Sequence, residues 1–123
     1  MKRRVLAAVD DILFVAKIRS AAETLGVRIE FARGLEKAFE LARAELPSVV
    51  IADLHSTRCD PVALAESFKS DPALAAVPLV GFFSHVQVEL QQRALAAGFD
   101  SVLPRSAFVQ RLPEILQSGE PDE

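Results

Sequence analysis

The sequence predicts an α/β protein in which a parallel sheet of five strands is covered by helices on both faces. Short apolar runs alternate five times with longer segments whose apolar residues recur at helical spacing. The links between these segments are short, and such alternation is typical of parallel strands joined by crossover helices. Half of the 123 residues are hydrophobic, which suffices for one core. We therefore expect a single domain over residues 1–118 and a short acidic tail over residues 119–123.

The expected strands are five short apolar runs. In chain order they cover residues 4–9, 27–32, 48–53, 79–83 and 101–103. The third run is the most apolar and should be the most central, because a strand buried on both faces has no polar side. The second run alternates apolar with charged residues, which indicates one wet face and predicts an edge strand.

The expected helices follow these strands, and several begin or end at residues typical of helix caps. In chain order they cover residues 12–25, 34–46, 61–69, 86–97 and 106–117. Gly26 and Gly98 stand where C-cap glycines belong, and Asp60 is placed as an N-cap before Pro61. Pro113 lacks the backbone N–H that a helix interior needs, so we expect it to interrupt the last helix.

Apolar residues at helical spacing identify the helix faces that should pack against the sheet. In the first helix they are Ile12, Val15, Ile18, Ala22 and Leu25. In the last helix they are Phe108, Leu112 and Ile115, which we expect to lie in the core.

Charge and composition give the chain the profile of a protein from a reducing compartment. The net charge of −3 gives no reason to expect nucleic acid or an anionic membrane as a partner. No apolar run approaches the ~20 residues of a membrane span, and the apolar part of residues 1–9 is shorter than the ~7–15 residues of a signal peptide. One cysteine, Cys59, excludes an internal disulfide. We therefore expect a cytoplasmic protein.

Acidic residues stand at the ends of the first and third expected strands. Asp10 and Asp11 follow the first strand, and Asp53 ends the third. Ligands of doubly wound sheets bind beyond the carboxyl ends of the strands, so these acids should share one edge. Neighbouring carboxylates resist joint ionisation unless a cation joins them, and Mg²⁺ prefers oxygen ligands. The sequence predicts a site for a cation and a phosphoryl group at this edge.

Three stretches resemble the response-regulator receiver domains of bacteria, the CheY-like family. "VDD" (residues 9–11) is similar to the family's acidic pair, and "VVIADL" (49–54) to the strand that carries its phosphorylated Asp. "ALAAGFDSVLPRSAF" (94–108) is similar to the stretch that ends the family's fifth strand. The resemblance covers about residues 4–117. It implies a flavodoxin-like (βα)5 fold with strand order 2-1-3-4-5.

The resemblance also implies a site and partners. Asp53 would accept a phosphoryl group, and Mg²⁺ would be held by Asp10, Asp11, Asp53 and the backbone carbonyl of His55. The phosphoryl group would come from a histidine kinase or a phosphotransfer protein, and a separate output protein would read the result. No enzymatic activity is expected, since any phosphoryl transfer would be to the chain's own Asp53.

The chain departs from the family pattern at several functional positions. Phe83 takes the place of the family's Ser or Thr, and Ser84 could donate that hydrogen bond only if the strand end bulges. Arg105 takes the place of the family's Lys and Ser106 that of the following Pro. Val102 replaces the aromatic residue that swings on activation. We expect Arg105 to project toward Asp53 from the end of the last strand.

These departures leave two hypotheses for the function. The first is a stand-alone receiver of a two-component phosphorelay that is phosphorylated on Asp53. The second is a pseudo-receiver, in which the same fold is a protein-interaction module that works without phosphorylation. The intact acids favour the first hypothesis, and the changes at positions 83, 102, 105 and 106 favour the second.

Other interpretations of the same residues are weaker. Asp11 could cap the first helix in addition to binding a cation. His55 and His85 fall at positions that line the mouth of the family's site, although either could be an ordinary surface histidine. A zinc site from His55, Cys59 and His85 lacks a recognisable ligand spacing. "DLHSTR" (53–58) partly resembles a cobalamin-binding motif, but Arg58 stands where that motif needs glycine.

Overall fold

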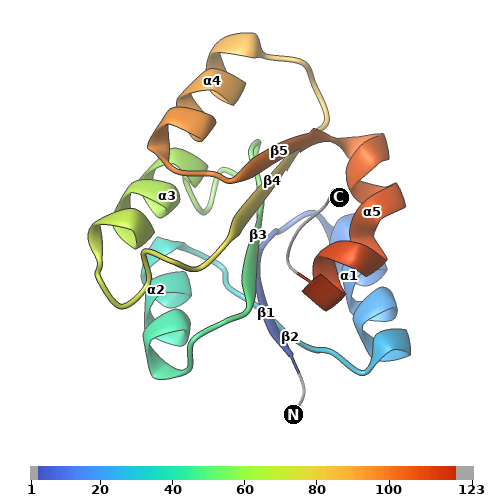
Figure 1. Ribbon diagram of the computed structural model, residues 1–123. Coiled ribbons are helices and arrows are strands. Elements are labelled where there is room, and N and C mark those ends of the chain that lie inside the picture. The colour runs from blue at the N-terminus through green and yellow to red at the C-terminus, as the bar shows by residue number, and fades with distance from the viewer. Residues whose placement is uncertain (1–2, 119–123) are drawn as a thin grey trace.

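The computed structural model describes residues 3–118, which form a five-stranded parallel sheet with helices on both faces (Figure 1). The strands are β1 (Arg4–Ala8), β2 (Arg28–Phe31), β3 (Val49–Asp53), β4 (Leu79–Phe83) and β5 (Ser101–Pro104). The helices are α1 (Ile12–Leu25), α2 (Leu35–Ala44), α3 (Pro61–Ser70), α4 (Val88–Ala97) and α5 (Arg105–Ser118). The spatial order of the strands is β2-β1-β3-β4-β5. The predicted fold class and strand order are confirmed, whereas the predicted acidic tail over 119–123 lies outside the described residues.

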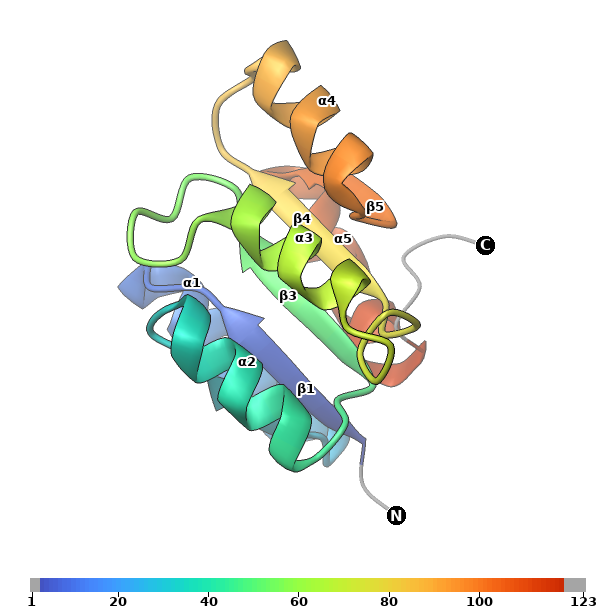
Figure 2. The ribbon, with the colours of Figure 1, turned by 90° about the vertical axis from the view of Figure 1, so that its left-hand side faces the viewer.

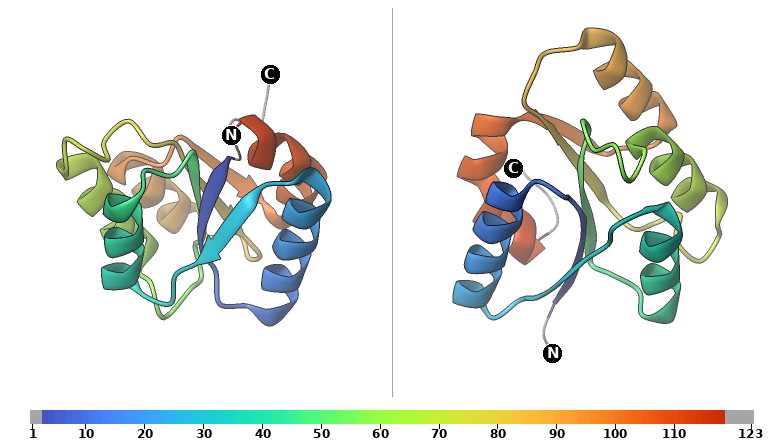
Figure 3. Two further views of the ribbon diagram at one scale, coloured as in Figure 1. Left: turned by 90° about the horizontal axis from the view of Figure 1, so that it is seen from below. Right: turned by 180° about the vertical axis from the view of Figure 1, so that it is seen from behind.

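Each strand contributes side chains to two apolar layers, one on either face of the sheet. Along β3, Val50 and Ala52 pack with α2, α3 and α4, while Val49 and Ile51 pack with α1 and α5. Figure 2 shows α2 and α3 lying in front of the sheet with α4 above them, and Figure 3 shows α1 and α5 together on the other face. As predicted, β3 is central and β2 lies at an edge.

The last helix corrects a prediction, because α5 runs through Pro113 without a break. Pro113 lies on the exposed side of α5, whereas Phe108, Leu112 and Ile115 are buried on the other side, as predicted. Proline removes one hydrogen bond from a helix, but the packing of these three side chains holds the backbone on both sides of it.

The start of α1 departs from the predicted apolar face. Ile12 was expected to face the core but is 82 % exposed, and Phe14 is buried in its place. The Asp11 carboxylate caps α1, and Phe14 is therefore in the first turn, where its ring packs against Phe82 with 4.6 Å between ring centroids.

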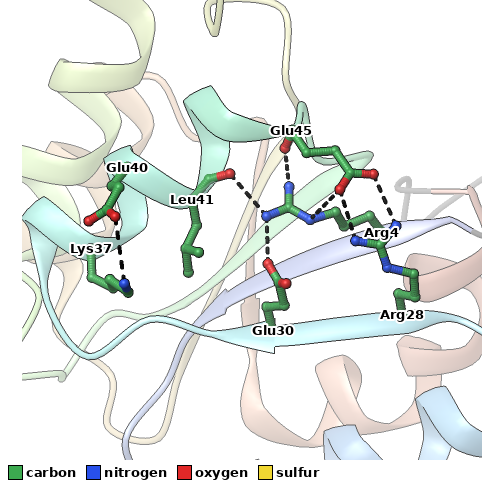
Figure 4. Close-up of polar contacts among 7 residues, drawn as sticks. All are labelled: Arg4, Arg28, Glu30, Lys37, Glu40, Leu41 and Glu45. Atoms are coloured by element: carbon green, nitrogen blue, oxygen red, sulfur yellow. Dashed lines mark hydrogen bonds and ion pairs between the residues drawn. The ribbon is translucent and has the colours of Figure 1, made fainter.

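A buried arginine at the amino end of β1 was not predicted. Arg4 is only 5 % exposed, and its guanidinium donates to the Glu30 carboxylate of β2 at 2.5 Å and to the Leu41 carbonyl of α2 at 2.9 Å (Figure 4). It also donates to the carbonyl of Glu45, the residue that follows α2. Arg4 therefore joins β1, β2 and the end of α2, where a cation also interacts favourably with the helix dipole.

Candidate functional site

The three predicted acids lie at the carboxyl edge of the sheet, on neighbouring strands. β1 and β3 pair in parallel with Ala8 opposite Ala52, so the residues that follow β1 lie beside the end of β3. Asp53 is the last residue of β3, and Asp10 and Asp11 form the link from β1 to α1. The charges of Asp10 and Asp11 both raise the pKa of Asp53, which shows that the three groups share one electrostatic environment.

Asp53 is half-buried, and its environment works against the charged form. Burial is the largest cause that raises the pKa of its carboxyl above the ordinary value. The backbone N–H of His55 donates to Asp53 Oδ1 at 2.9 Å and thereby lowers the pKa. The charges of Asp10 and Asp11 raise the pKa further. A cation placed among these carboxylates would lower the pKa of Asp53.

Asp11 is the N-cap of α1. Its Oδ1 accepts hydrogen bonds from the backbone N–H groups of Leu13 at 2.9 Å and Phe14 at 3.2 Å. Such a cap satisfies helix N–H groups that have no partner within the helix. The alternative that Asp11 caps the first helix is thus confirmed, and this bond fixes one of its two oxygens.

Asp10 contacts the loop that follows Asp53. Its Oδ2 lies 3.4 Å from the Ser56 hydroxyl and 3.9 Å from Nε of Arg58. Neither contact was predicted, and the only signal in the sequence was that both residues follow the expected phospho-acceptor closely. The loop therefore brings one hydroxyl donor and one guanidinium to the acidic edge.

The donor atoms of this edge fit magnesium better than a softer metal. Carboxylates and a backbone carbonyl supply only oxygen, which Mg²⁺ prefers, whereas zinc favours Cys and His ligands. Within residues 3–118, no group of three His, Cys, Asp or Glu side chains is arranged so that it could hold a metal ion, so a cation at the acidic edge stays a prediction. Burial raises the pKa of the Cys59 thiol to about 11, so the thiolate that zinc would need is disfavoured.

Arg105 does not point to Asp53. Its guanidinium carbon lies 5.3 Å from the ring centroid of Phe14, in a cation–π contact with the first turn of α1. In the part of the chain that the structure describes, no ion pair joins Arg105 to Asp53. The prediction that it projects toward Asp53 is therefore wrong for this structure. Arg105 is the first residue of α5, and α5 packs beside α1.

The other altered positions do not recover the family's donor. Phe83 is 7 % exposed and packs in the apolar layer beneath α3 and α4. The pairing of β4 with β5 continues regularly to Phe83 opposite Pro104, so the strand lacks the bulge that Ser84 would need. Val102 packs against the same apolar layer, and Ser106 is exposed in the first turn of α5.

The two histidines meet across the mouth of the site. Their ring centroids are 5.5 Å apart in an edge-on arrangement, and the backbone N–H of His85 donates to His55 Nε2 at 3.3 Å. This contact links the loop after β3 to the loop after β4. It agrees with the expectation that both residues line the mouth, and the direct contact between them was not foreseen.

Comparisons with known proteins were made with the sequence and with the fold. No family model matches the chain. A gliding motility regulatory protein of Myxococcus xanthus is 29 % identical over 100 residues, which are 81 % of this chain. The chain spans only 13 % of the length of that relative.

Solved structures of receiver domains match over almost the whole chain. The chemotaxis response regulator CheY4 of Vibrio cholerae aligns with a TM-score of 0.81 and 19 % identity, over 95 % of this chain and 98 % of that one. A CheY-like receiver domain protein of Methanospirillum hungatei aligns with a TM-score of 0.80 and 18 % identity, over 97 % and 94 %.

A third match has magnesium in its site. It is the receiver domain of a sensor histidine kinase of Pseudomonas aeruginosa, with magnesium coordinated in the active-site cleft. It aligns with a TM-score of 0.82 and 17 % identity, over 95 % of this chain and 96 % of that one. None of the helices described here is both long and apolar enough to cross a membrane.

The three structural matches cover nearly the whole chain at TM-scores of 0.80 to 0.82, so the chain has the fold of the CheY-like receiver domains of response regulators.

Proposed function

We propose that the chain is a receiver module of a two-component system that accepts a phosphoryl group on Asp53. The observation that carries this proposal is the position of Asp53 at the end of the central strand, beside Asp10 and Asp11. In this position the half-buried carboxylate that we propose as nucleophile lies next to two further carboxylates, whose oxygens are the ligand type that a divalent cation prefers.

The reaction is a transfer of a phosphoryl group from a phosphohistidine of a kinase or phosphotransfer protein. An oxygen of the Asp53 carboxylate attacks phosphorus, a P–O bond forms, and the P–N bond to the imidazole breaks. The electron pair of that bond stays on the imidazole nitrogen, which is neutralised by a proton. Magnesium, when bound, would screen the charge of the phosphoryl oxygens.

The chain's own residues have separate parts in this step. Asp10, Asp11, Asp53 and the carbonyl of His55 would hold the cation. The backbone N–H of His55, which already donates to Asp53 Oδ1 at 2.9 Å, orients the nucleophile. Burial raises the pKa of Asp53, and a cation held beside it would lower this pKa and so favour the carboxylate form that attacks.

A second candidate function is the pseudo-receiver, which a specific pair of observations favours. Phe83 is packed into the core and cannot donate to a phosphoryl oxygen, and Arg105 lies over Phe14 instead of toward Asp53. The loss of one donor to a charged group weakens its binding by about 1.5–3 kcal/mol. Such a loss weakens the phosphorylated state without preventing its formation, so we retain the receiver as the leading proposal.

The test is covalent labelling with acetyl phosphate and Mg²⁺, followed by intact mass spectrometry. We expect the wild type to gain one phosphoryl group and Asp53→Asn to gain none. Asp60→Asn is the matched control, because Asp60 is an exposed carboxylate whose Oδ1 accepts the capping hydrogen bonds of α3 and it is not among the predicted site residues. If the wild type gains no mass under conditions that label a CheY-like control protein, the receiver proposal fails and the pseudo-receiver remains.

The proposed partners follow from this chemistry. A histidine kinase or phosphotransfer protein would supply the phosphoryl group in the cytoplasm, and a separate output protein would respond to the phosphorylated chain. A chain that works in this way needs no substrate other than the phosphodonor, and we do not propose an independent enzymatic activity.

A further inference from the structure

We propose that the guanidinium of Arg58 is a resident cation of the acidic edge, which a divalent cation must displace from Asp10. Arg58 thereby sets the magnesium concentration at which the chain can be phosphorylated. This inference rests on the proposed function and adds to it a regulation of the same site, by a residue outside the predicted ligand set.

Arg58 lies in the loop of residues 54–60, which joins β3 to α3 beyond the carboxyl end of β3 (Figure 2). Its Nε lies 3.9 Å from Oδ2 of Asp10. The Arg58 side chain is 63 % exposed, whereas the Asp10 side chain is 31 % exposed. The guanidinium is thus the outer member of the pair, and it covers Asp10 on the side from which a hydrated cation would have to enter.

The backbone around Arg58 is held in place on both sides. The next residue, Cys59, is buried, and its N–H donates to the Ser56 hydroxyl at 3.2 Å. That hydroxyl in turn donates to Asp10 Oδ2 at 3.4 Å. The Arg58 carbonyl lies 3.6 Å from the position that a Cβ on Gly34 would occupy, so the loop also passes close to the start of α2. The Arg58 side chain can therefore leave Asp10 by rotation about its own bonds, without a rearrangement of the loop.

The contact of Arg58 differs in charge from the contacts of the other two acids. Asp11 accepts backbone N–H groups of α1, and Asp53 accepts the backbone N–H of His55. These neutral donors leave the carboxylate charges uncompensated, whereas the guanidinium offsets the charge of Asp10. Because the affinity of an oxygen site for a divalent cation depends on the charge of its ligands, Arg58 weakens the binding of Mg²⁺ to this edge.

The size of the effect follows from the exposure of the ion pair. Exposed pairs contribute only a small free energy, since water and salt screen them. We therefore expect Arg58→Gln to bind Mg²⁺ about two- to fivefold more tightly than wild type. Arg58→Lys keeps the positive charge and should stay close to wild type. A role of Arg58 in folding alone would not separate the two variants by their charge.

The first test is a titration of each protein with Mg²⁺, followed by the NMR amide signals of Asp53 and His55. Arg93→Gln is the matched control, because Arg93 is an exposed arginine of α4 and its loss changes the net charge by the same amount. Equal dissociation constants for wild type and Arg58→Gln would overturn the inference. Tighter binding by Arg93→Gln to the same extent would also overturn it, since the effect would then come from net charge.

A measurement on the wild type needs no substitution. The Nε–H signal of Arg58 should shift over the same range of Mg²⁺ concentration as the amide of His55. The internal control is Arg43, whose guanidinium pairs with Asp71 and should not respond. A shift of His55 without a shift of Arg58 would show that the guanidinium is not displaced, and the inference would fail.

Labelling by acetyl phosphate separates this inference from the proposed function. We expect the Mg²⁺ concentration that gives half-maximal labelling of Asp53 to fall by the same factor in Arg58→Gln. The same Mg²⁺ dependence in both proteins would overturn the inference and leave the receiver proposal standing. If Mg²⁺ binds in the expected order of affinities but Asp53 is not labelled, the displacement of Arg58 is supported and the receiver proposal fails. If the wild type and Arg58→Gln neither bind Mg²⁺ nor become labelled, both are overturned.

Discussion

We expect the buried guanidinium of Arg4 to stabilise this fold more than most other single side chains do. We consider the substitution Arg4→Met, which keeps an unbranched apolar side chain and removes the charge. It deletes the hydrogen bonds to the Glu30 carboxylate and to the carbonyls of Leu41 and Glu45 (Figure 4). This side chain then no longer links β1 to β2 and to the end of α2.

The loss of stability depends on whether each former partner of Arg4 can be solvated by water after the substitution. Breaking a buried ion pair by removing one member costs about 3–5 kcal/mol, because the other charge is left uncompensated. Here the Glu30 side chain is 39 % exposed and can return to water, so its share of that cost is reduced. The two carbonyls lose a charged donor, worth about 1.5–3 kcal/mol per bond before solvation by water. We therefore expect the free energy of unfolding to fall by an amount near the lower end of the first range, about 3 kcal/mol.

The assay is urea denaturation followed by circular dichroism, with Arg28→Met as the matched control. Arg28 makes two hydrogen bonds to the Glu45 carboxylate, at 3.0 and 2.9 Å, but both side chains are exposed. Exposed pairs contribute little, so the control should stay close to wild type. Equal midpoints for Arg4→Met and Arg28→Met, or a gain in stability for Arg4→Met, would refute the reasoning.

Two further predictions concern Asp53 and a glycine. The pKa of Asp53 is raised in the folded state above the ordinary pKa of 3.8. At a pH just above 3.8 the native chain therefore binds more protons than the unfolded chain. The contribution of Asp53 to stability consequently falls as the pH rises through this range. Asp53→Asn should therefore be more stable than wild type at pH 7 without Mg²⁺ and should lose this advantage near pH 3; thermal melts across pH test this, and an equal or lower midpoint at pH 7 would contradict it. Gly98→Ala should destabilise more than Gly26→Ala in the same melts: both glycines have positive φ, which costs an alanine about 1–2 kcal/mol, but only at Gly98 would the new Cβ lie 2.5 Å from Lys69 Cγ. Equal losses for the two variants would show that Lys69 moves aside freely.

The acids of the site show how far local patterns reach toward function. Asp10, Asp11 and Asp53 could be assigned to one edge from the sequence, because parallel strands with short crossovers end on the same side of the sheet. Their cation and the phosphorylation of Asp53 remain proposals with the tests given above. The partners of Asp10 in the loop after β3, Ser56 and Arg58, could not be predicted, since a loop's path depends on contacts with the rest of the fold.

The sequence by itself determined the kinds of elements, their order and the layering of the sheet. Apolar runs and helical spacing are local properties, and a run such as residues 49–52 can be stable only between two covering layers. The alternation of charged and apolar residues in 27–32 likewise placed β2 at an edge. These features could be predicted because only one arrangement of the layers buries the apolar side chains.

Only the tertiary structure decided where individual side chains point at the ends of elements. Pro113 stays within α5 because the residues around it are buried on the side facing the sheet. Ile12 is exposed and Phe14 buried because the Asp11 cap sets where the first turn of α1 begins. Arg105 rests on Phe14 because α1 and α5 lie side by side, although 91 positions separate the two residues in the sequence (105 − 14). An arginine side chain has several rotatable bonds, and neighbours that are distant along the chain select its direction.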